Sequence, residues 1–214
     1  MLFDPARHEP LRAIAWDADA ARACIQHVVR DAESHFDPEH FWPAHPRDRA
    51  ADAASTVGLT PLYHGACGAV WALHYLQDVG AATLQSDYIP CLDAARSHNR
   101  AWLGEVAEEA AASYMMGDTP FLLMQWARAK DPAELEDRLA RLITGNMDQP
   151  CRELMWGSPG TLLAALFLHG RSGDARWAEL FVRTAAKLWS QLQWSEEFQC
   201  HYWTQDMYGR QSTY

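Results

Sequence analysis

The sequence predicts an all-α fold, and two observations carry this prediction. Several segments place apolar residues at helical spacing, whereas no segment shows the sustained alternation of apolar and polar residues that indicates a strand. In addition, turns centred on Gly65, Gly117 and Gly157 each lead straight into an almost uninterrupted apolar stretch. Repeats of this size are typical of stacked helical hairpins, because one hairpin alone leaves its apolar face exposed.

The first part of the chain is expected to hold two helices separated by a long loop. Asp17 is placed to cap a helix whose apolar stripe covers residues 21–36. Prolines at positions 38, 43 and 46 then indicate a surface loop over residues 35–60. An apolar helix follows, beginning at about Gly65 and ending near Gly80.

The rest of the chain alternates amphipathic and apolar helices. Asp131 followed by Pro132 is a start signal for one of them, since it combines a capping side chain with proline at the first helical position. The helices expected here cover residues 87–106, 117–129, 132–143, 158–169 and 174–189. The last twenty residues, 195–214, show no period and are expected to be irregular.

This alternation predicts how the helices are arranged. A helix that is apolar on every side has to be buried on every side, and the helices after the three glycine turns are of this kind. An inner ring of apolar helices wrapped by an outer ring, an α/α toroid, provides such burial. We therefore expect a single domain over residues 1–214 that forms an incomplete toroid, with the inner-helix N-termini gathered at one end.

Composition restricts the function further. The chain has 214 residues, 49% of them hydrophobic, with ten Trp, so one large core is expected. A net charge of −10 disfavours nucleic acid and anionic membranes as partners. The five Cys are scattered and form no CxxC pair, and the first residues do not resemble a signal peptide. Free thiols and a cytoplasmic location are therefore expected.

The three turns together resemble those of the lanthionine synthetase C-like family, the LanC and LanC-like proteins. Residues 62–68 (LYHGACG) look like the first turn of that family, and residues 116–120 (MGDTP) are similar to the second. Residues 153–160 (ELMWGSPG) look like the third, which has an acidic residue four positions before its first glycine. The resemblance covers about residues 60–170 and implies an α/α toroid of about twice the present length.

The resemblance also implies a chemistry. LanC enzymes add a Cys thiol to a dehydroamino acid in a peptide, and a zinc ion held by two Cys and one His activates the thiol. Those ligands lie in the second half of the family's toroid, so none is carried over to this chain and no cofactor is expected in it. Only Glu153 matches a family site residue, as the catalytic acidic group. By this reading the chain is the N-terminal half of a LanC-like protein, and it is inactive alone.

The candidate site residues lie mostly at the turn ends of the apolar helices. Those assigned to substrate binding are His64, Gly65, Cys67, Gly117, Asp118, Trp156 and Gly157. Each also has a structural alternative: Cys67 as a packed thiol, Asp118 as a helix cap, and the Trp residues as core. Cys200 and His201 form a Cys-His pair, but no glycine turn or apolar helix follows them, so an aromatic-rich loop is the simpler interpretation than a zinc ligand pair.

Other functions fit the same sequence. The chain is also compatible with a non-catalytic module that binds a peptide or a glutathione-like thiol at the turn end. A fragment of a carbohydrate-active α/α toroid is a further alternative, which requires paired carboxylates and cavity Trp residues. In each case the open flank of a half-ring is expected to favour self-association or a protein partner.

Overall fold

The computed structural model describes residues 13–44, 58–207 and 210–213, and this part of the chain is mostly helical. The α-helices are α1 (Ala18–Ser34), α2 (Ala66–Asp78), α3 (Leu92–Leu103), α4 (Ala107–Ala110), α5 (Thr119–Trp126), α6 (Ala133–Gly145), α7 (Ser158–Ser172) and α8 (Ala175–Ser190). Two 3-10 turns, η2 (Ile89–Cys91) and η3 (Gly104–Val106), flank α3. No described helix is long and apolar enough to cross a membrane.

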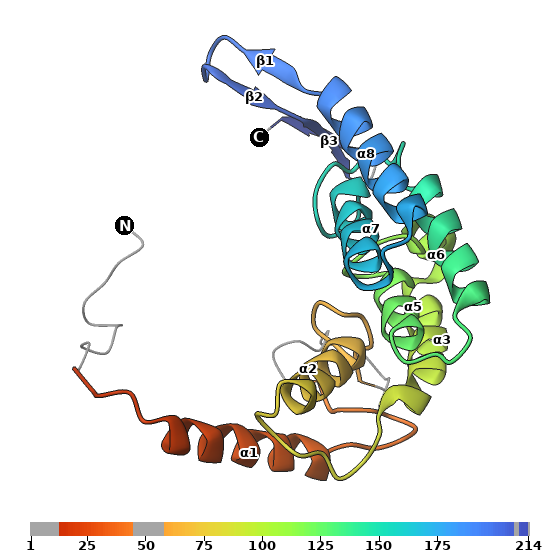
Figure 1. Ribbon diagram of the computed structural model, residues 1–214. Coiled ribbons are helices and arrows are strands. Elements are labelled where there is room, and N and C mark those ends of the chain that lie inside the picture. Colours follow the sequence, from red (N-terminus) through yellow and green to blue (C-terminus); the bar gives the residue numbers. More distant parts are fainter. Residues whose placement is uncertain (1–12, 45–57, 208–209, 214) are drawn as a thin grey trace.

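The helices follow an open arc of two layers (Figure 1). The helices that follow the glycine turns, α2, α5 and α7, lie towards the inner side of the arc, and α3, α6 and α8 lie along its outer side. Helix α5 is central, since it packs against α2, α3, α6 and α7. The predicted helical class is therefore confirmed, and the apolar and amphipathic helices lie on opposite sides of an open arc.

The core consists of two apolar clusters that meet at α5. One cluster joins α1, α2 and α3 and includes Val70, Leu92 and Phe121. The other joins α6, α7 and α8 and includes Leu122. Because Phe121 and Leu122 are adjacent and both fully buried, α5 locks the two halves of the arc together.

The predicted capping is found at α1 but not at α6, where Pro132 rather than Asp131 occupies the N-cap position and makes no capping hydrogen bond. The Asp17 carboxylate accepts hydrogen bonds from the backbone N–H groups of Asp19 and Ala20, both at 3.0 Å, so Asp17 caps α1 as predicted. Asp174 caps α8 in the same way, and Gly173 ends α7 with a left-handed φ of 69°. Helix α7 therefore ends at Ser172, three residues later than predicted.

The single helix expected over residues 87–106 is interrupted. Pro90 lies in the 3-10 turn η2, where its missing N–H is tolerated. Gly104 then has a φ of 57°, a backbone conformation that ends α3 and that side chains other than glycine rarely adopt. Pro90 and Gly104 therefore divide the predicted segment into η2, α3 and η3, and the short helix α4 follows it.

The C-terminal segment was predicted to be irregular, and this prediction is wrong. The segment forms two antiparallel hairpins, β1 (Gln193–Ser195) with β2 (Cys200–Tyr202) and β3 (Thr204–Met207) with β4 (Arg210–Thr213). Strands of three or four residues are too short to produce a recognisable alternation. Strand β3 also contacts the segment before the third glycine turn, where Asp206 N–H donates to the Pro150 carbonyl at 3.2 Å.

The Trp residues are less buried than predicted. Among the described Trp side chains only Trp177 is fully buried, whereas Trp16, Trp71, Trp102, Trp189 and Trp194 are exposed. The inner helices are likewise not buried on every side: Trp71 on α2 is 52% exposed and Phe167 on α7 is 48% exposed. One side of these helices is therefore left open, and it forms the site described next.

Candidate functional site

The glycines of the three turns are required because the backbone folds back on itself there. A Cβ at Gly65 would lie 2.5 Å from the Leu59 carbonyl oxygen, and one at Gly117 would lie 2.6 Å from the Ala111 carbonyl oxygen. At Gly157 the distance to the Cys151 carbonyl oxygen would be 1.7 Å. In each turn the carbonyl oxygen of the sixth residue before the glycine lies this close, so the three backbone paths are alike, although at Gly117 the Ala110 carbonyl oxygen is closer still, at 2.1 Å.

The turns are also hydrogen-bonded to one another at equivalent positions. The N–H of Tyr63 donates to the Met115 carbonyl at 3.1 Å, and the N–H of Met115 donates to the Met155 carbonyl at 3.2 Å. Each of these residues stands two positions before its turn glycine. The three turns thus form one continuous row, which holds the N-termini of α2, α5 and α7 side by side.

Glu153 lies at the end of this row. Its carboxylate accepts hydrogen bonds from the N–H groups of Met155 and Trp156, both at 2.7 Å. In the first two turns, the N–H group at this position donates to the carbonyl of the next turn. Among the described residues no further turn carbonyl accepts from the Met155 N–H, and the Glu153 carboxylate accepts from it instead. Both carboxylate oxygens are engaged by the backbone, and the arrangement is that of an anchor for the third turn.

The inner helices line an apolar groove of about 1130 Å³ next to the row. Helix α2 contributes its first two turns, α5 contributes residues from Pro120 onward, and α7 contributes residues 166–171. Of the residues predicted to bind substrate, His64 and Gly65 line this groove. The structure therefore brings the first turn and the C-terminal half of α7 to one surface, although about a hundred residues of sequence separate them.

Aromatic side chains form the walls of the groove. Tyr63, Trp71 and Phe167 are exposed, and Trp71 stacks on Tyr75 at a ring-centroid distance of 5.4 Å. Tyr114 lies 6.5 Å from Phe167 between ring centroids, and burial raises the pKa of its hydroxyl above the ordinary value. Arg171 is the one lining side chain that carries a fixed charge, so the described groove suits an apolar ligand with few polar groups.

Sequence reasoning missed most of this surface. Tyr63, Trp71, Phe167 and Arg171 were not among the predicted site residues, although they line the groove. A signal was present in α7, where Leu166, Phe167 and Gly170 share one helix face. The all-round apolar character of the helix concealed it, because nothing in the sequence separates the side that faces the core from the side that faces the groove.

Other predicted residues support the turns and lie outside the groove. Gly117 and Gly157 are buried in their turns, and the half-buried Trp156 does not line the groove. Cys67 is fully buried in the core, and burial raises the pKa of its thiol well above the ordinary value. A thiol in that state is a weak nucleophile, so the packed alternative describes Cys67.

Asp118 has a different structural role from the predicted cap. Its side chain makes no capping hydrogen bond, and it is 4% exposed. Instead, its carboxylate pairs with Arg100 Nε at 3.0 Å and with Arg96 Nη1 at 3.5 Å. Both arginines belong to α3, so Asp118 fastens the second glycine turn to the outer layer of helices.

Cys200 and His201 lie in strand β2, away from the glycine turns. Both side chains are exposed, and the His201 ring packs against Trp194 at 5.0 Å between ring centroids. The hairpin of β1 and β2 projects beyond α8 at the opposite end of the arc from α2 (Figure 1). Within residues 13–44, 58–207 and 210–213, no three His, Cys, Asp or Glu side chains are grouped so that they would hold a metal ion.

Comparisons of the chain with protein-family models, with curated proteins and with solved structures found no match. An assignment of function therefore depends on the geometry of the turns and of the groove.

Proposed function

We propose that this chain is the N-terminal part of a LanC-like protein and that its groove binds an apolar segment of a peptide substrate. The observation that carries the proposal is the groove itself, because three inner helices present one continuous apolar surface beside their aligned turns. In this proposal the arc of two helical layers is a section of an α/α toroid. The groove is then part of the wall of its central cavity.

The groove favours binding over reaction. Thiol addition to a dehydroamino acid requires an activated thiolate and a proton donor. No Cys, Asp or Glu is among the residues that line the groove in the described chain. Glu153, the residue matched to the family's catalytic acid, is engaged by two backbone N–H groups. We therefore propose that zinc-dependent thiol chemistry belongs to the full family toroid and that this chain supplies a substrate-binding wall.

The carbohydrate-active alternative lacks a comparable basis. Glycoside cleavage uses two carboxyl groups on either side of the bond that breaks. The groove has aromatic side chains that would stack on a sugar, but no carboxylate among its described lining residues.

A peptide-binding experiment tests the proposal. The probe is a blocked hexapeptide of Leu, Phe and Ala, and its counterpart of equal length contains Ser and Asn. We expect the apolar peptide to bind saturably by isothermal titration calorimetry and to change the fluorescence of Trp71 and Trp126. The polar peptide is expected to bind at least about tenfold more weakly, which corresponds to the loss of two or more buried methylene groups.

Surface variants locate the binding. Trp71→Ser and Phe167→Ser remove half-exposed groove walls, so each is expected to weaken binding while the fold is kept. Trp189→Ser is the matched control, because Trp189 on α8 is 76% exposed and does not line the groove. Equal weakening by Trp189→Ser, or equal affinity for the polar peptide, would refute binding in the groove.

A further inference from the structure

The side of helix α8 that points away from the core is apolar along its length. The opposite side buries the residues that pack against the rest of the arc, which are Trp177, Leu180, Thr184 and Leu188. On the outward side, Val182 is 62% exposed and Trp189 is 76% exposed. Ala175 and Ala186 are exposed there as well. Residues seven apart share one side of a helix, so Ala175, Val182 and Trp189 form a line, which together with Ala186 we call the outer stripe.

An exposed apolar stripe on this side of a helix indicates a contact surface. The outward side of a surface helix normally carries polar residues. Helix α8 has 16 residues and is about 24 Å long, so the stripe offers several helical turns to a partner. The hairpin beyond the end of α8 exposes Trp194 and Phe198 too, and apolar side chains therefore gather at this end of the arc (Figure 1).

Two charged residues lie along one edge of the outer stripe. Glu179 and Arg183 are four residues apart on the same side of the stripe, and both are exposed. Within the described chain, neither of them forms an ion pair with any other side chain. The two other cations of the helix are paired, Arg176 with Glu136 at 3.0 Å and Lys187 with Asp148. The edge therefore presents one anion and one cation that are available to a partner.

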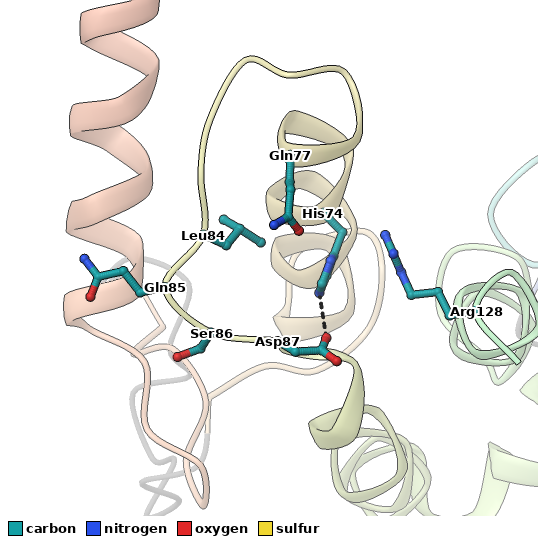
Figure 2. A pocket seen from close by; sticks show the side chains of 7 residues that line it. All are labelled: His74, Gln77, Leu84, Gln85, Ser86, Asp87 and Arg128. Carbon is teal, nitrogen blue, oxygen red and sulfur yellow. Dashed lines mark ion pairs between the residues drawn. The ribbon is translucent and has the colours of Figure 1, made fainter.

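The charged groups at the opposite end of the arc already have partners. A pocket of about 400 Å³ lies beside the last turns of α2, and Figure 2 shows its side chains. His74 Nε2 accepts the Tyr88 N–H at 3.3 Å and lies 3.3 Å from Asp87 Oδ1. Arg128 lines the same pocket but pairs with Asp78 at 3.0 Å. In contrast to the edge of the outer stripe, this pocket offers no unpaired cation within the described chain.

The edge of the outer stripe is complementary to itself. In an antiparallel pair of α8 helices related by a two-fold axis, the same edge of both copies lies on the same side, with its sequence direction reversed. An axis that crosses the helix near residue 181 places each Glu179 opposite the Arg183 of the other copy. One contact then forms two ion pairs. In a parallel pair related by a two-fold axis, the two edges lie on opposite sides and these ion pairs are not formed.

Charge also restricts where two copies can approach each other. The chain has a net charge of −10, so two copies repel each other over most of their surface. Along the outer stripe the charges of Glu179 and Arg183 sum to zero. The acidic Glu196 and Glu197 follow β1, beyond the end of the helix, and a pair centred near residue 181 leaves them outside the contact between the helices.

We propose that the outer stripe of α8 binds a second copy of this chain, as an antiparallel helix pair about a two-fold axis. The inference is independent of the groove, because no residue of α8 lines it. Each copy contributes one helix to the contact, which is less surface than a permanent dimer buries. The dimer is therefore weak, with a Kd of about 10 μM or higher.

Sedimentation velocity of the whole chain measures this association. We expect the weight-average mass to rise from that of one chain towards that of two as the concentration increases from about 1 μM to about 1 mM. Trp189→Ser removes the largest side chain of the stripe and is expected to weaken the dimer by about tenfold. A mass that stays at one chain over this range would overturn the proposal.

Charge reversals test which surfaces pair. Arg183→Glu and Glu179→Arg each place like charges opposite each other twice, so each variant alone is expected to dimerise about tenfold more weakly. An equimolar mixture of the two variants should recover the affinity of the unchanged chain, because one copy then has two anions along the edge and the other has two cations. Arg22→Glu on α1 is the control, since Arg22 is 67% exposed and its reversal changes the net charge equally. The proposal is wrong if Arg22→Glu weakens the dimer as much as Arg183→Glu does, or if the mixture associates no better than either variant.

Discussion

The backbone N–H of Met115 donates to the carbonyl of Met155 at 3.2 Å, and each of these residues stands two positions before a turn glycine. Residues 40 apart in sequence are thereby held in equivalent positions. The same bond joins Tyr63 to Met115. The row of turns therefore depends on the backbone path that the glycines allow, and substitutions at the glycines test how much of the fold depends on it.

Gly157→Ala is expected to destabilise the protein by about 2–4 kcal/mol. The added Cβ would lie 1.7 Å from the Cys151 carbonyl oxygen, and a backbone carbonyl has little freedom to move away. The free energy of unfolding measured in urea checks this. Gly145→Ala is the matched control, because no atom lies within 4 Å of that Cβ and α6 should gain about 0.5 kcal/mol. Equal stability of the two variants would contradict the close approach at the third turn.

Glu153→Gln is expected to cost about 1–2 kcal/mol of stability. A carboxylate accepts from both Met155 and Trp156, whereas the amide has one oxygen and places an NH₂ group against a backbone N–H. Urea unfolding is again the measurement. Glu179→Gln on the exposed side of α8 removes the same charge and should leave stability nearly unchanged. An unchanged stability of Glu153→Gln would show that the carboxylate does not anchor the turn.

The sequence predicted the helices better than their exposure. Capping by an aspartate is a local interaction, so the starts of α1 and α8 were predicted correctly, whereas α3 begins five residues later than predicted, at Leu92 rather than at residue 87. Whether a Trp is buried depends on which helices pack against it, and this information is not local. Trp177 and Trp189 lie on the same helix and are equally apolar, yet one is fully buried and the other is 76% exposed.

The candidate site was predicted in part, because the turns have a sequence signature and the groove has none. Gly65 and His64 were found from the first turn, whereas Phe167 was missed. A further repeat of the turn pattern was also overlooked. Met207-Tyr208-Gly209 follows Met155-Trp156-Gly157 by 52 residues, the spacing that separates Gly65 from Gly117. The strands β3 and β4 beside this sequence are too short to show a period, and among the described residues no apolar helix follows it as one follows each of the first three turns.

Asp118→Asn is expected to destabilise the protein by about 2–4 kcal/mol. The substitution removes the charge that Arg96 and Arg100 face and leaves the partly buried Arg96 without its inner partner. Asp93→Asn is the control, since that carboxylate also pairs with Arg96 but is 73% exposed, and its loss should cost less than about 1 kcal/mol. Thermal unfolding of both variants measures the difference in stability. An equal loss of stability for the two would show that burial of Asp118 does not strengthen its ion pairs.

The stability of the protein is expected to depend on the protonation of His74. Burial, followed by the charge of Arg128, lowers the pKa of His74 below its ordinary value of 6.5, although Asp87 and Asp78 oppose this shift. The unfolded chain therefore binds more protons, so this contribution is fully present above about pH 6.5 and decreases as the pH falls through the folded-state pKa. Protonation at Nε2 also places a second N–H against that of Tyr88. His74→Gln offers an amide oxygen at this position and does not titrate. Unfolding free energies measured from about pH 7 to pH 5 should fall more steeply for the unchanged chain than for His74→Gln, and parallel curves would exclude His74 as the titrating group.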